Sequence, residues 1–324
     1  MLRVAMVAYD NCLLSGVAGQ LDLLTIANWE QRRLQPQSKE PFCRYEIVTS
    51  GGGPVTSFNR MPVMPKRALN DCQDADLIFI PGMMGNPDRL LQQQALIGWL
   101  QQQARRGTII ASACSGAFLL AEAGLLDGCP ATTHWQLAER FRQRYPQVDL
   151  QIDRLVIDGG SYLCAGGTSA HQDLALYLVE KFGTAQLAGA CARMMLIDNR
   201  RREQAPFVHF RGRKNHSDAP ILKVQQWLDS HYRGKVVVKE LAVLAGLNER
   251  TFLRRFRKAT GEAPLDYLQR LRIEQAKRLL AGSQQQLEQI THAVGYADVS
   301  SFRRLFKQVV GISPSVYRQR FSTL

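Results

Sequence analysis

Residues 241–267 read LAVLAGLNERTFLRRFRKATGEAPLDY, and residues 290–317 repeat the pattern as ITHAVGYADVSSFRRLFKQVVGISPSVY. In each copy a short apolar segment ends at a glycine, Gly246 or Gly295, and the next segment carries two phenylalanines four residues apart. Glycine ends a helix readily because it adopts the left-handed backbone conformation, and residues four apart share one helical face. The repeat therefore predicts two helix-turn-helix motifs, at about 238–260 and 287–310.

Both copies close on the same pattern, Gly-x-x-Pro-x-x-Tyr, which ends at Tyr267 in the first copy and at Tyr317 in the second. Residues 265–280, between the copies, have apolar residues at helical spacing and predict a long connecting helix. One copy alone would fit an ordinary amphipathic hairpin equally well, because short motif matches have a real false-positive rate. Two copies without a third argue against a solenoid or propeller and favour a paired helix-turn-helix domain.

The paired motif, with its connecting helix and closing tyrosines, resembles the AraC/XylS family of bacterial transcription regulators over residues 221–321. The resemblance implies that the second helix of each motif enters the major groove of double-stranded DNA. Arg254 and Arg304 occupy matching positions, two residues before the second phenylalanine of each copy, and are the first candidates for base contacts. The other predicted DNA-binding residues are Arg250, Thr251, Val299, Ser300 and Arg303.

The positive charge of the chain is concentrated in the part that holds the repeat. Residues 1–200 contain 18 Lys+Arg and 18 Asp+Glu, whereas residues 201–324 contain 23 and 10, which accounts for the whole net charge of +13. A basic domain beside a neutral one is typical of phosphate binding, and we expect its affinity for DNA to fall with salt. A merely solvated basic surface is the alternative interpretation.

The first two hundred residues alternate short β-prone segments with helical ones. This alternation predicts an α/β sandwich with a mainly parallel sheet. Residues 11–20 are expected to form a loop. Strands are predicted at 2–9, 45–49, 75–80, 108–112 and 154–157, and helices at 21–29, 87–104, 117–123, 170–182 and 184–196.

A tight turn is predicted where the strand 108–112 meets the helix 117–123. The sequence there, ASACSGAF, places Cys114 and Gly116 in the small-x-Cys-x-Gly pattern of a nucleophile elbow. With Gly82 after the preceding strand and a Thr-Thr-His-Trp segment downstream, the junction resembles the PfpI-type, class I glutamine-amidotransferase-like fold over residues 1–195. The resemblance implies a flavodoxin-like domain whose candidate ligand-binding residues are Gly82, Met83, Cys114, Ser115, His134 and Trp135.

Cys114 lacks part of a catalytic set in the sequence. In enzymes of the resembling fold, the elbow cysteine is followed by or paired with a histidine, and an acidic residue near the first helix lies against it. Here Ser115 follows the cysteine, and no carboxylate lies between Asp10 and Asp22. Because no acid orients a base, we expect no catalytic residue and a Cys114 that lines a pocket. A ligand-contacting or redox-sensitive thiol is the alternative.

The remaining cysteines and histidines predict no further site. Seven cysteines, all before residue 200 and without a Cys-x-x-Cys pair, favour reduced and mostly buried thiols over disulfides or zinc. The histidines show no metal-binding spacing, so we expect neither a metal nor a cofactor. No run of about 18 apolar residues and no signal peptide is visible, which favours a cytoplasmic protein without a membrane span, associated with the nucleoid when bound to DNA.

Together these features predict a regulator with a sensory domain at 1–197, a linker at 198–219 and a DNA-binding domain at 220–324. The resemblances imply a promoter or operator as the DNA partner, a nitrogenous metabolite as effector, contact with RNA polymerase, and a homodimer formed through the N-terminal domain. Activation is favoured over repression because the family consists mostly of activators. Two alternatives stay open: a thiol-dependent hydrolase or amidase with a basic tail, and a nonspecific DNA-packaging protein.

Overall fold

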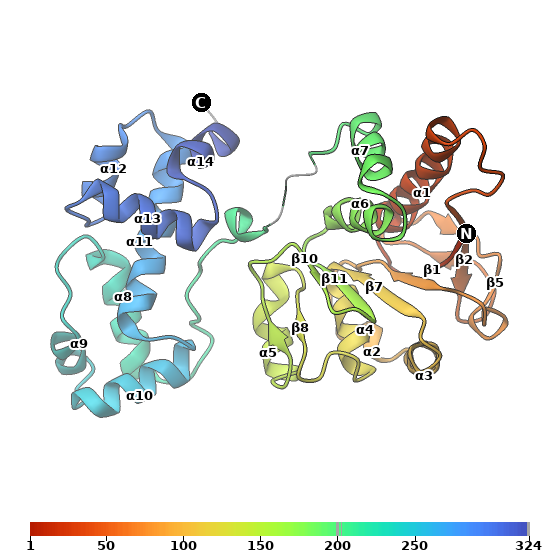
Figure 1. The fold of residues 1–324 in the computed structure, drawn as a ribbon. Coiled ribbons are helices and arrows are strands. Elements are labelled where there is room, and N and C mark those ends of the chain that lie inside the picture. Colours follow the sequence, from red (N-terminus) through yellow and green to blue (C-terminus); the bar gives the residue numbers. More distant parts are fainter. Residues whose placement is uncertain (199–200, 202, 323–324) are drawn as a thin grey trace. The chain divides into compact units, whose positions relative to one another are not determined.

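The structure, a computed structural model, describes residues 1–198, 201 and 203–322. The chain folds as two compact units, Met1–Gln204 and Ala205–Leu324 (Figure 1). The predicted linker 198–219 is thus shared between the units, and its positions 199, 200 and 202 lie outside the described residues, as do 323–324. Among the described residues, no helix combines the length and the apolar character needed to span a bilayer.

The first unit is built on a seven-stranded sheet in the order β10-β11-β7-β6-β1-β2-β5. Neighbouring strands run parallel, except for the antiparallel pair β10 and β11. The strands are β1 Leu2–Val7, β2 Cys43–Thr49, β5 Arg67–Ala68, β6 Leu77–Ile80, β7 Ile109–Ala113, β10 Val156–Asp158 and β11 Tyr162–Ala165. Two small sheets pair β3 Val55–Thr56 with β4 Pro62–Val63, and β8 Pro130–Ala131 with β9 Asp149–Leu150. The predicted mainly parallel sheet is confirmed.

Helices cover both faces of this sheet, because its central strands are apolar on both sides: every residue of β6 and of β11 is buried. One face is covered by α1 Leu14–Leu34, α6 Ala170–Phe182 and α7 Ala185–Met194 (Figure 1). The other is covered by α2 Asp88–Leu91, α3 Gln94–Arg105, α4 Ala117–Glu122 and α5 Ala138–Arg144. The carboxyl ends of β1, β6, β7 and β11 lie at one edge, as parallel strands require, and the elbow follows β7 there.

The prediction of one helix over 87–104 was wrong, because the segment forms two helices, α2 and α3. In a continuous helix, Leu91 and Leu96 would point about 140° apart, so that both could not face the same core. The break at Gln93, whose backbone is not helical, allows both leucines to be buried.

The loop predicted at 11–20 is also wrong, because α1 begins at Leu14. Gly16 obscured this helix, since glycine disfavours a helix interior. Its role is a close approach: a Cβ at Gly16 would lie 3.1 Å from Pro81 Cβ. The glycine thus sets how near α1 lies to the loop that follows β6.

The described residues of the second unit form helices joined by short loops and turns. The helices are α8 Ala219–His231, α9 Val238–Leu244, α10 Glu249–Thr260, α11 Pro264–Gly282, α12 Leu287–Ala293, α13 Val299–Val310 and α14 Pro314–Phe321. Both predicted motifs are present, as α9–α10 and α12–α13, with α11 as the connecting helix. Asp218 begins α8 by accepting a hydrogen bond from the Ile221 N–H at 3.3 Å.

Each motif has its own aromatic core, and the two cores repeat one another. In the first, the rings of Phe252 and Phe256 lie 5.6 Å apart, and Tyr267 packs on Phe256 at 5.6 Å. In the second, Phe302 and Phe306 lie 5.7 Å apart, and the closing tyrosine packs on Phe306 at 5.7 Å. The closing Gly-x-x-Pro-x-x-Tyr pattern therefore completes the core of each motif. Aromatic pairs at these separations add about 0.5–1.5 kcal/mol each beyond the area they bury.

Residues 205–216, here called the strap, precede α8 and pack against α11. Glu274 and Lys277, one turn apart on α11, are both buried, and their charged groups lie 3.5 Å apart. His209 Nδ1 of the strap lies 2.9 Å from Glu274 Oε1, and the Lys277 ammonium donates to the Val208 carbonyl. Buried charges require such partners, because removing one leaves its mate unpaired in a poorly solvating interior.

The strap also contacts the aromatic cores of both motifs. Its Phe210 ring packs 5.1 Å from Tyr267 of the first motif, and its Phe207 ring packs 5.2 Å from Phe321 of the second. The Phe210 N–H donates to Glu274 at 3.1 Å, which gives that buried carboxylate a further hydrogen bond. Much of the segment predicted to be a linker is therefore part of the second unit.

We predict that Glu274→Ala lowers the free energy of unfolding of the second unit by about 3 kcal/mol, because it leaves Lys277 buried without its carboxylate. Urea unfolding of the intact chain, followed by far-ultraviolet circular dichroism, measures this change. Glu288→Ala, on the exposed first turn of α12, is the matched control and should change stability by less than about 0.5 kcal/mol. Equal effects of the two substitutions would contradict the assignment.

Candidate nucleic-acid interface and elbow

The second helix of each motif, α10 or α13, is started by a side-chain cap. Asn248 accepts a hydrogen bond from the Thr251 N–H at 2.9 Å, and Asp298 accepts one from the Ser301 N–H at 2.6 Å. These caps satisfy backbone donors that the first helical turn leaves free. They fix where each helix begins, and therefore which residues lie on its leading turn.

The turns before these two helices require glycine. Gly246 has a φ of 67° and Gly295 a φ of 87°, in the left-handed region that other residues rarely adopt. Gly295 is doubly constrained, because a Cβ there would lie 2.5 Å from the Arg233 carbonyl oxygen. The second turn thus packs directly on the loop between α8 and α9, which precedes the first motif.

Arg272 of α11 joins the two motifs at this contact. Its guanidinium donates to the Tyr232 carbonyl at 2.7 Å and to the Gly234 carbonyl at 2.8 Å, and it stacks 5.2 Å from the Tyr296 ring. A guanidinium can do all three because it combines a planar face with several fixed donors. Together with the strap, Arg272 fixes the position of α10 relative to α13.

The residues predicted to bind DNA lie on the outer faces of α10 and α13, away from the buried phenylalanines. Arg250, Arg254, Ser300, Arg303 and Arg304 are exposed, while Thr251 and Val299 are half-buried in the leading turns. Asn248 and Asp298, which cap these turns, are also exposed. The structure therefore gathers the predicted set on two helices of one compact unit.

Arg255, next to Arg254, has a different environment. Its guanidinium donates to both carboxylate oxygens of Asp218, at 2.9 and 2.8 Å, and so ties α10 to the start of α8. The paired arginine lowers the pKa of the Asp218 carboxyl. Adjacent arginines thus divide into one that faces solvent and one that holds the unit together.

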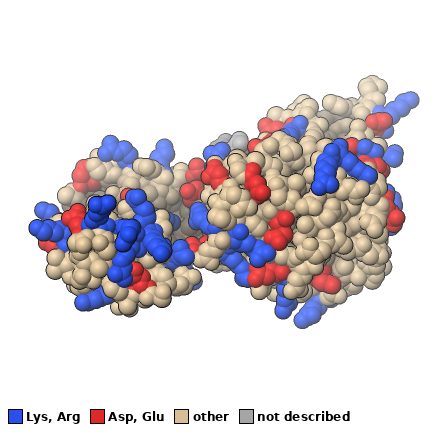
Figure 2. All heavy atoms as spheres, turned by 90° about the horizontal axis from the view of Figure 1, so that it is seen from below, with Lys and Arg blue, Asp and Glu red and all other residues tan. Residues whose placement is uncertain are grey.

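Basic side chains dominate the surface of the second unit. Residues 205–324 contain 21 Lys+Arg and 9 Asp+Glu, and Figure 2 shows Lys and Arg gathered on the face of this unit that is turned to the viewer. The exposed basic residues of α10 and α13 are Arg250, Arg254, Arg257, Lys258, Arg303, Arg304 and Lys307. Such a field attracts the DNA backbone, and the attraction weakens as salt rises.

The elbow of the first unit is formed where β7 passes into α4 through the short turn Cys114–Gly116. Cys114 has a φ of 56°, the strained conformation that a nucleophile elbow imposes on a residue other than glycine. Two glycines make room for it. A Cβ at Gly82 would lie 2.7 Å from Cys114 Cβ, and a Cβ at Gly116 would lie 2.9 Å from the Ile80 carbonyl oxygen.

Hydrogen bonds hold the elbow in this shape. The Ser115 hydroxyl accepts from the Met83 N–H at 2.8 Å and donates to the Met83 carbonyl at 3.2 Å. The Thr133 hydroxyl donates to the Cys114 carbonyl at 2.7 Å, which brings the segment that holds His134 to the elbow. Four of the predicted ligand-binding residues, Gly82, Met83, Cys114 and Ser115, are thus in contact with one another.

The environment of Cys114 favours a neutral thiol. Only 5% of the residue is exposed, and burial raises its pKa from 9.0 to about 11, although hydrogen bonds from Ser115 and Thr168 act in the opposite direction. His134 is half-buried, which lowers its pKa, and its Nδ1 accepts from the Gln136 N–H at 3.2 Å. Its ring stacks on Trp135 at 5.7 Å. Within the described residues, none of the hydrogen bonds of the thiol comes from His134.

Comparison with known proteins agrees with both halves of this description. A helix-turn-helix domain matches residues 241–320, and the DJ-1/PfpI family matches residues 33–181. The HTH-type transcriptional regulator CdhR of Pseudomonas aeruginosa is 30% identical over 273 residues, which cover 84% of this chain and 80% of that protein. The chain belongs to the DJ-1/PfpI–AraC family of transcription regulators. It is a DNA-binding regulator with an effector domain.

Two further similarities concern part of this regulator. Isonitrile hydratase of Pseudomonas putida is 31% identical over 151 residues, which cover 45% of this chain and 64% of the enzyme. The crystal structure of an AraC family transcriptional regulator from Pseudomonas putida matches 60% of this chain and 100% of its own, with a TM-score of 0.52 and 19% identity. That structure shows the fold alone. Since the chain is similar both to an enzyme and to regulators, catalysis has to be judged from the elbow itself.

Sequence reasoning missed Thr168, which follows β11 and forms a hydrogen bond with the Cys114 thiol. The signal was present as Ala165-Gly166-Gly167-Thr168, a strand that ends in two glycines before a helix. The strand itself, β11, was not predicted because it has only four residues. Without β11 in the sheet beside β7, nothing placed Thr168 near the elbow.

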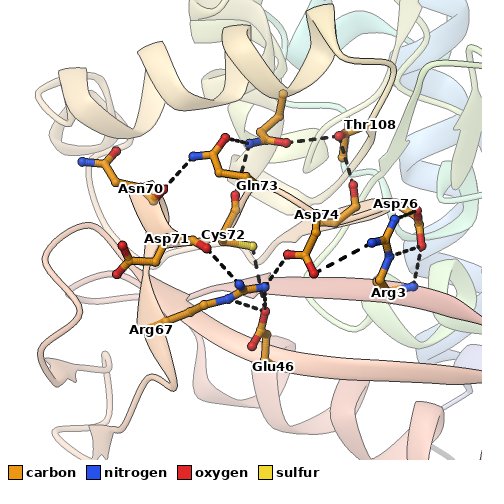
Figure 3. Close-up of polar contacts among 12 residues, drawn as sticks. Arg3, Glu46, Arg67, Asn70, Asp71, Cys72, Gln73, Asp74, Asp76 and Thr108 are labelled. Atoms are coloured by element: carbon orange, nitrogen blue, oxygen red, sulfur yellow. Dashed lines mark hydrogen bonds and ion pairs between the residues drawn. The ribbon is translucent and has the colours of Figure 1, made fainter.

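A second polar cluster lies in the first unit, at β2 and β5. One ligand atom each from Glu46, Cys72 and Asp74 lies within 4.8 Å of the others, as in a metal site. Figure 3 shows Arg67 between the two carboxylates, and its guanidinium donates to Glu46 at 2.7 Å and to Asp74 at 2.6 Å. Because the arginine supplies the positive charge, we interpret this cluster as an ion-pair network that secures the short strand β5 to β2.

The Cys114 environment of the regulator leads to a prediction about pH. Since burial raises the folded-state pKa above 9.0, the neutral thiol stabilises the fold below pH 9, and this stability is lost as pH rises through about 11. Alkylation of Cys114 by iodoacetamide, followed by mass spectrometry of its peptide, should therefore accelerate near pH 11. The same peptide in the urea-unfolded chain should react with a midpoint near 9. Coinciding profiles would show that the fold does not protect the thiol.

Proposed function

We propose that this cytoplasmic regulator reads an asymmetric DNA site with α10 and α13 and activates transcription when the DJ-1/PfpI unit binds a small nitrogenous metabolite. One observation carries the proposal. Arg254 and Arg304 occupy matching exposed positions, each two residues before a fully buried phenylalanine of its motif. A homodimer formed through the DJ-1/PfpI units and contact with RNA polymerase complete the proposal, on the precedent of the family.

The DNA step combines electrostatic attraction with base reading. A bidentate contact from an arginine to guanine distinguishes bases by about 1–3 kcal/mol. The leading turns differ between the helices, because α10 presents Arg250 and Thr251 where α13 presents Ser300 and Ser301. Arg303 of α13 corresponds to Leu253 of α10, which adds a third difference. We therefore expect each protomer to read two different sequences in successive major-groove segments.

We predict that Arg254→Ala and Arg304→Ala each weaken binding to the preferred site by about tenfold or more and relax base preference at different positions. Selection of bound sequences from a random DNA pool by the intact regulator measures both effects. Arg278→Ala removes an exposed positive charge from α11 and serves as the control, with unchanged base preference. If the selected sequences of the two recognition-helix variants matched those of the wild type, these arginines would not read bases.

The elbow supports the effector half of the proposal. We infer that Gly82, Met83, Cys114, Ser115, His134 and Trp135 bind the effector without catalytic turnover. A neutral thiol, an imidazole and backbone groups near an indole ring suit a small ligand with a polar and an apolar part. The strained Cys114 conformation, supported by neighbouring glycines and hydrogen bonds, is a form of preorganisation that binding exploits as readily as catalysis does.

A thiol-dependent enzyme is the second candidate function. The elbow geometry and the similarity to isonitrile hydratase favour it. The raised pKa of Cys114 and the engagement of His134 Nδ1 with the Gln136 N–H argue against it, because the thiolate is the nucleophile and needs a base.

We predict that the intact regulator neither hydrates an isonitrile nor hydrolyses an amide above the background rate. We also predict that Cys114→Ser retains the transcriptional response to effector in a reporter strain. A bound ligand loses little when a thiol becomes a hydroxyl, whereas a catalyst would lose its nucleophile. Turnover that disappears in Cys114→Ser would establish the enzyme and refute this part of the proposal.

A further inference from the structure

A cavity of about 640 Å³ opens in the first unit, lined by residues other than those of the elbow. One wall is the face of α6 that carries Asp173, Leu176, Tyr177 and Glu180, which lie on successive helical turns. Small residues of α7, among them Gly189, form the opposite wall, and β10 contributes as well. The volume lies within the range of small-molecule sites, about 300–1,000 Å³.

Two of the carboxylates in this cavity are already neutralised. Asp158 accepts from the Tyr177 hydroxyl at 2.6 Å and from the Lys181 ammonium at 2.5 Å. Asp173 is paired with Arg201, whose Nε donates to it at 3.2 Å. These pairs leave the tyrosine ring and the aliphatic parts of the side chains as much of the lining.

Two other charged side chains of the lining are not neutralised. In the part of the chain that the structure describes, neither the Arg154 guanidinium nor the Glu180 carboxylate forms a side-chain hydrogen bond or an ion pair. Both charged residues are exposed, and the same lining includes the buried apolar residues Leu176 and Ala188. The cavity thus offers one positive group, one negative group and an apolar wall.

We propose that this cavity binds a small zwitterion and that its occupation alters DNA binding. Arg154 would hold the carboxylate through paired hydrogen bonds, Glu180 the ammonium group, and Leu176 with Ala188 the carbon chain between them. The site is additional to the elbow, and its regulatory role rests on the proposed function. The charged groups that would bind the ligand, those of Arg154 and Glu180, form no ion pair with other described residues.

The position of the cavity in the chain provides a route to the DNA-binding unit. Arg201 of its lining belongs to the last residues of the first unit. Close by in sequence, the buried Gln204 amide donates to the Thr132 hydroxyl at 3.0 Å and to the Thr133 carbonyl at 2.9 Å. The same amide donates to the Arg154 carbonyl at 3.3 Å, so a ligand held by Arg154 would act on the segment through which the chain leaves this unit.

The first experiment is calorimetric titration of the intact regulator with ω-amino acids of increasing length, from glycine to 6-aminohexanoate. Hexanoate and hexylamine, each with a single charge, are the comparisons. At least one zwitterion should bind roughly tenfold more tightly than either comparison, since a charge-assisted hydrogen bond contributes on that scale. Arg154→Gln should remove the advantage over hexylamine, and Glu180→Gln the advantage over hexanoate. Absence of binding across the series would overturn the proposal.

The second experiment fills the cavity with a larger side chain. A Cβ at Gly189 meets no neighbour closer than 3.5 Å, so Gly189→Leu is accommodated by the helix while its side chain occupies the space. Gly98→Leu in α3 is the matched control, because a Cβ there has no neighbour within 4 Å and the cavity is lined by other residues. Gly189→Leu should lose zwitterion binding at least tenfold, and Gly98→Leu should retain it. Equal binding by the two variants would place the ligand elsewhere and refute the proposal.

DNA binding distinguishes this inference from the proposed function. The affinity of the regulator for its selected site, measured with and without the bound zwitterion, should change at least threefold in the wild type and remain constant in Gly189→Leu. A selective regulator that ignores the zwitterion would overturn the inference and leave the proposed function intact. A protein that binds the zwitterion without preferring any DNA sequence would contradict the proposed function, and with it the regulatory role of the cavity.

Discussion

Two buried charges on α11 constrain the whole DNA-binding unit. Glu274 and Lys277 lie beneath the strap, and both are only about 4% exposed. They pair with one another and form hydrogen bonds with His209, the Phe210 N–H and the Val208 carbonyl of the strap, so the helix and the strap have to fold together. Two residues before Glu274 on the same helix, Arg272 joins the loop before the first motif to the turn of the second. The two motifs therefore form one rigid DNA-binding unit instead of two independent hairpins.

We propose that this rigidity gives the regulator its sequence specificity, while its positive charge gives affinity for the DNA backbone. The excess of basic residues attracts any DNA, but only a fixed separation between α10 and α13 makes two short base readings into one site. The first unit is nearly neutral and has the architecture of an enzyme fold, with a strained Cys114 whose thiol is buried and protonated. We propose that this unit binds an effector, and the neutral, buried thiol argues against its use as a nucleophile.

Much of this fold is predictable from the sequence because its elements correspond to periodic patterns of residues. The repeated Gly, Phe and Tyr positions predicted both motifs, and the alternation of strands and helices predicted the sheet. Contacts without local signals were not predictable. Nothing in the sequence relates His209 to Glu274, which lie 65 residues apart, or Thr168 to Cys114, because such pairs depend on packing. The cavity was not predictable for the same reason, because it depends on how the small residues of α7 pack beside α6.

The most direct test of the account is the spacing of the DNA site. With the sequence preferred by the intact regulator in hand, about five base pairs, or half a helical turn, are inserted between the segments read by α10 and α13. The affinity at physiological salt is then compared with that for the uninterrupted site. If α10 and α13 are held rigidly, the affinity for the altered site falls toward the non-specific level. The inserted base pairs turn the second segment to the opposite side of the duplex, where the second helix cannot reach it. Unchanged affinity would show that the motifs move independently and would contradict the account.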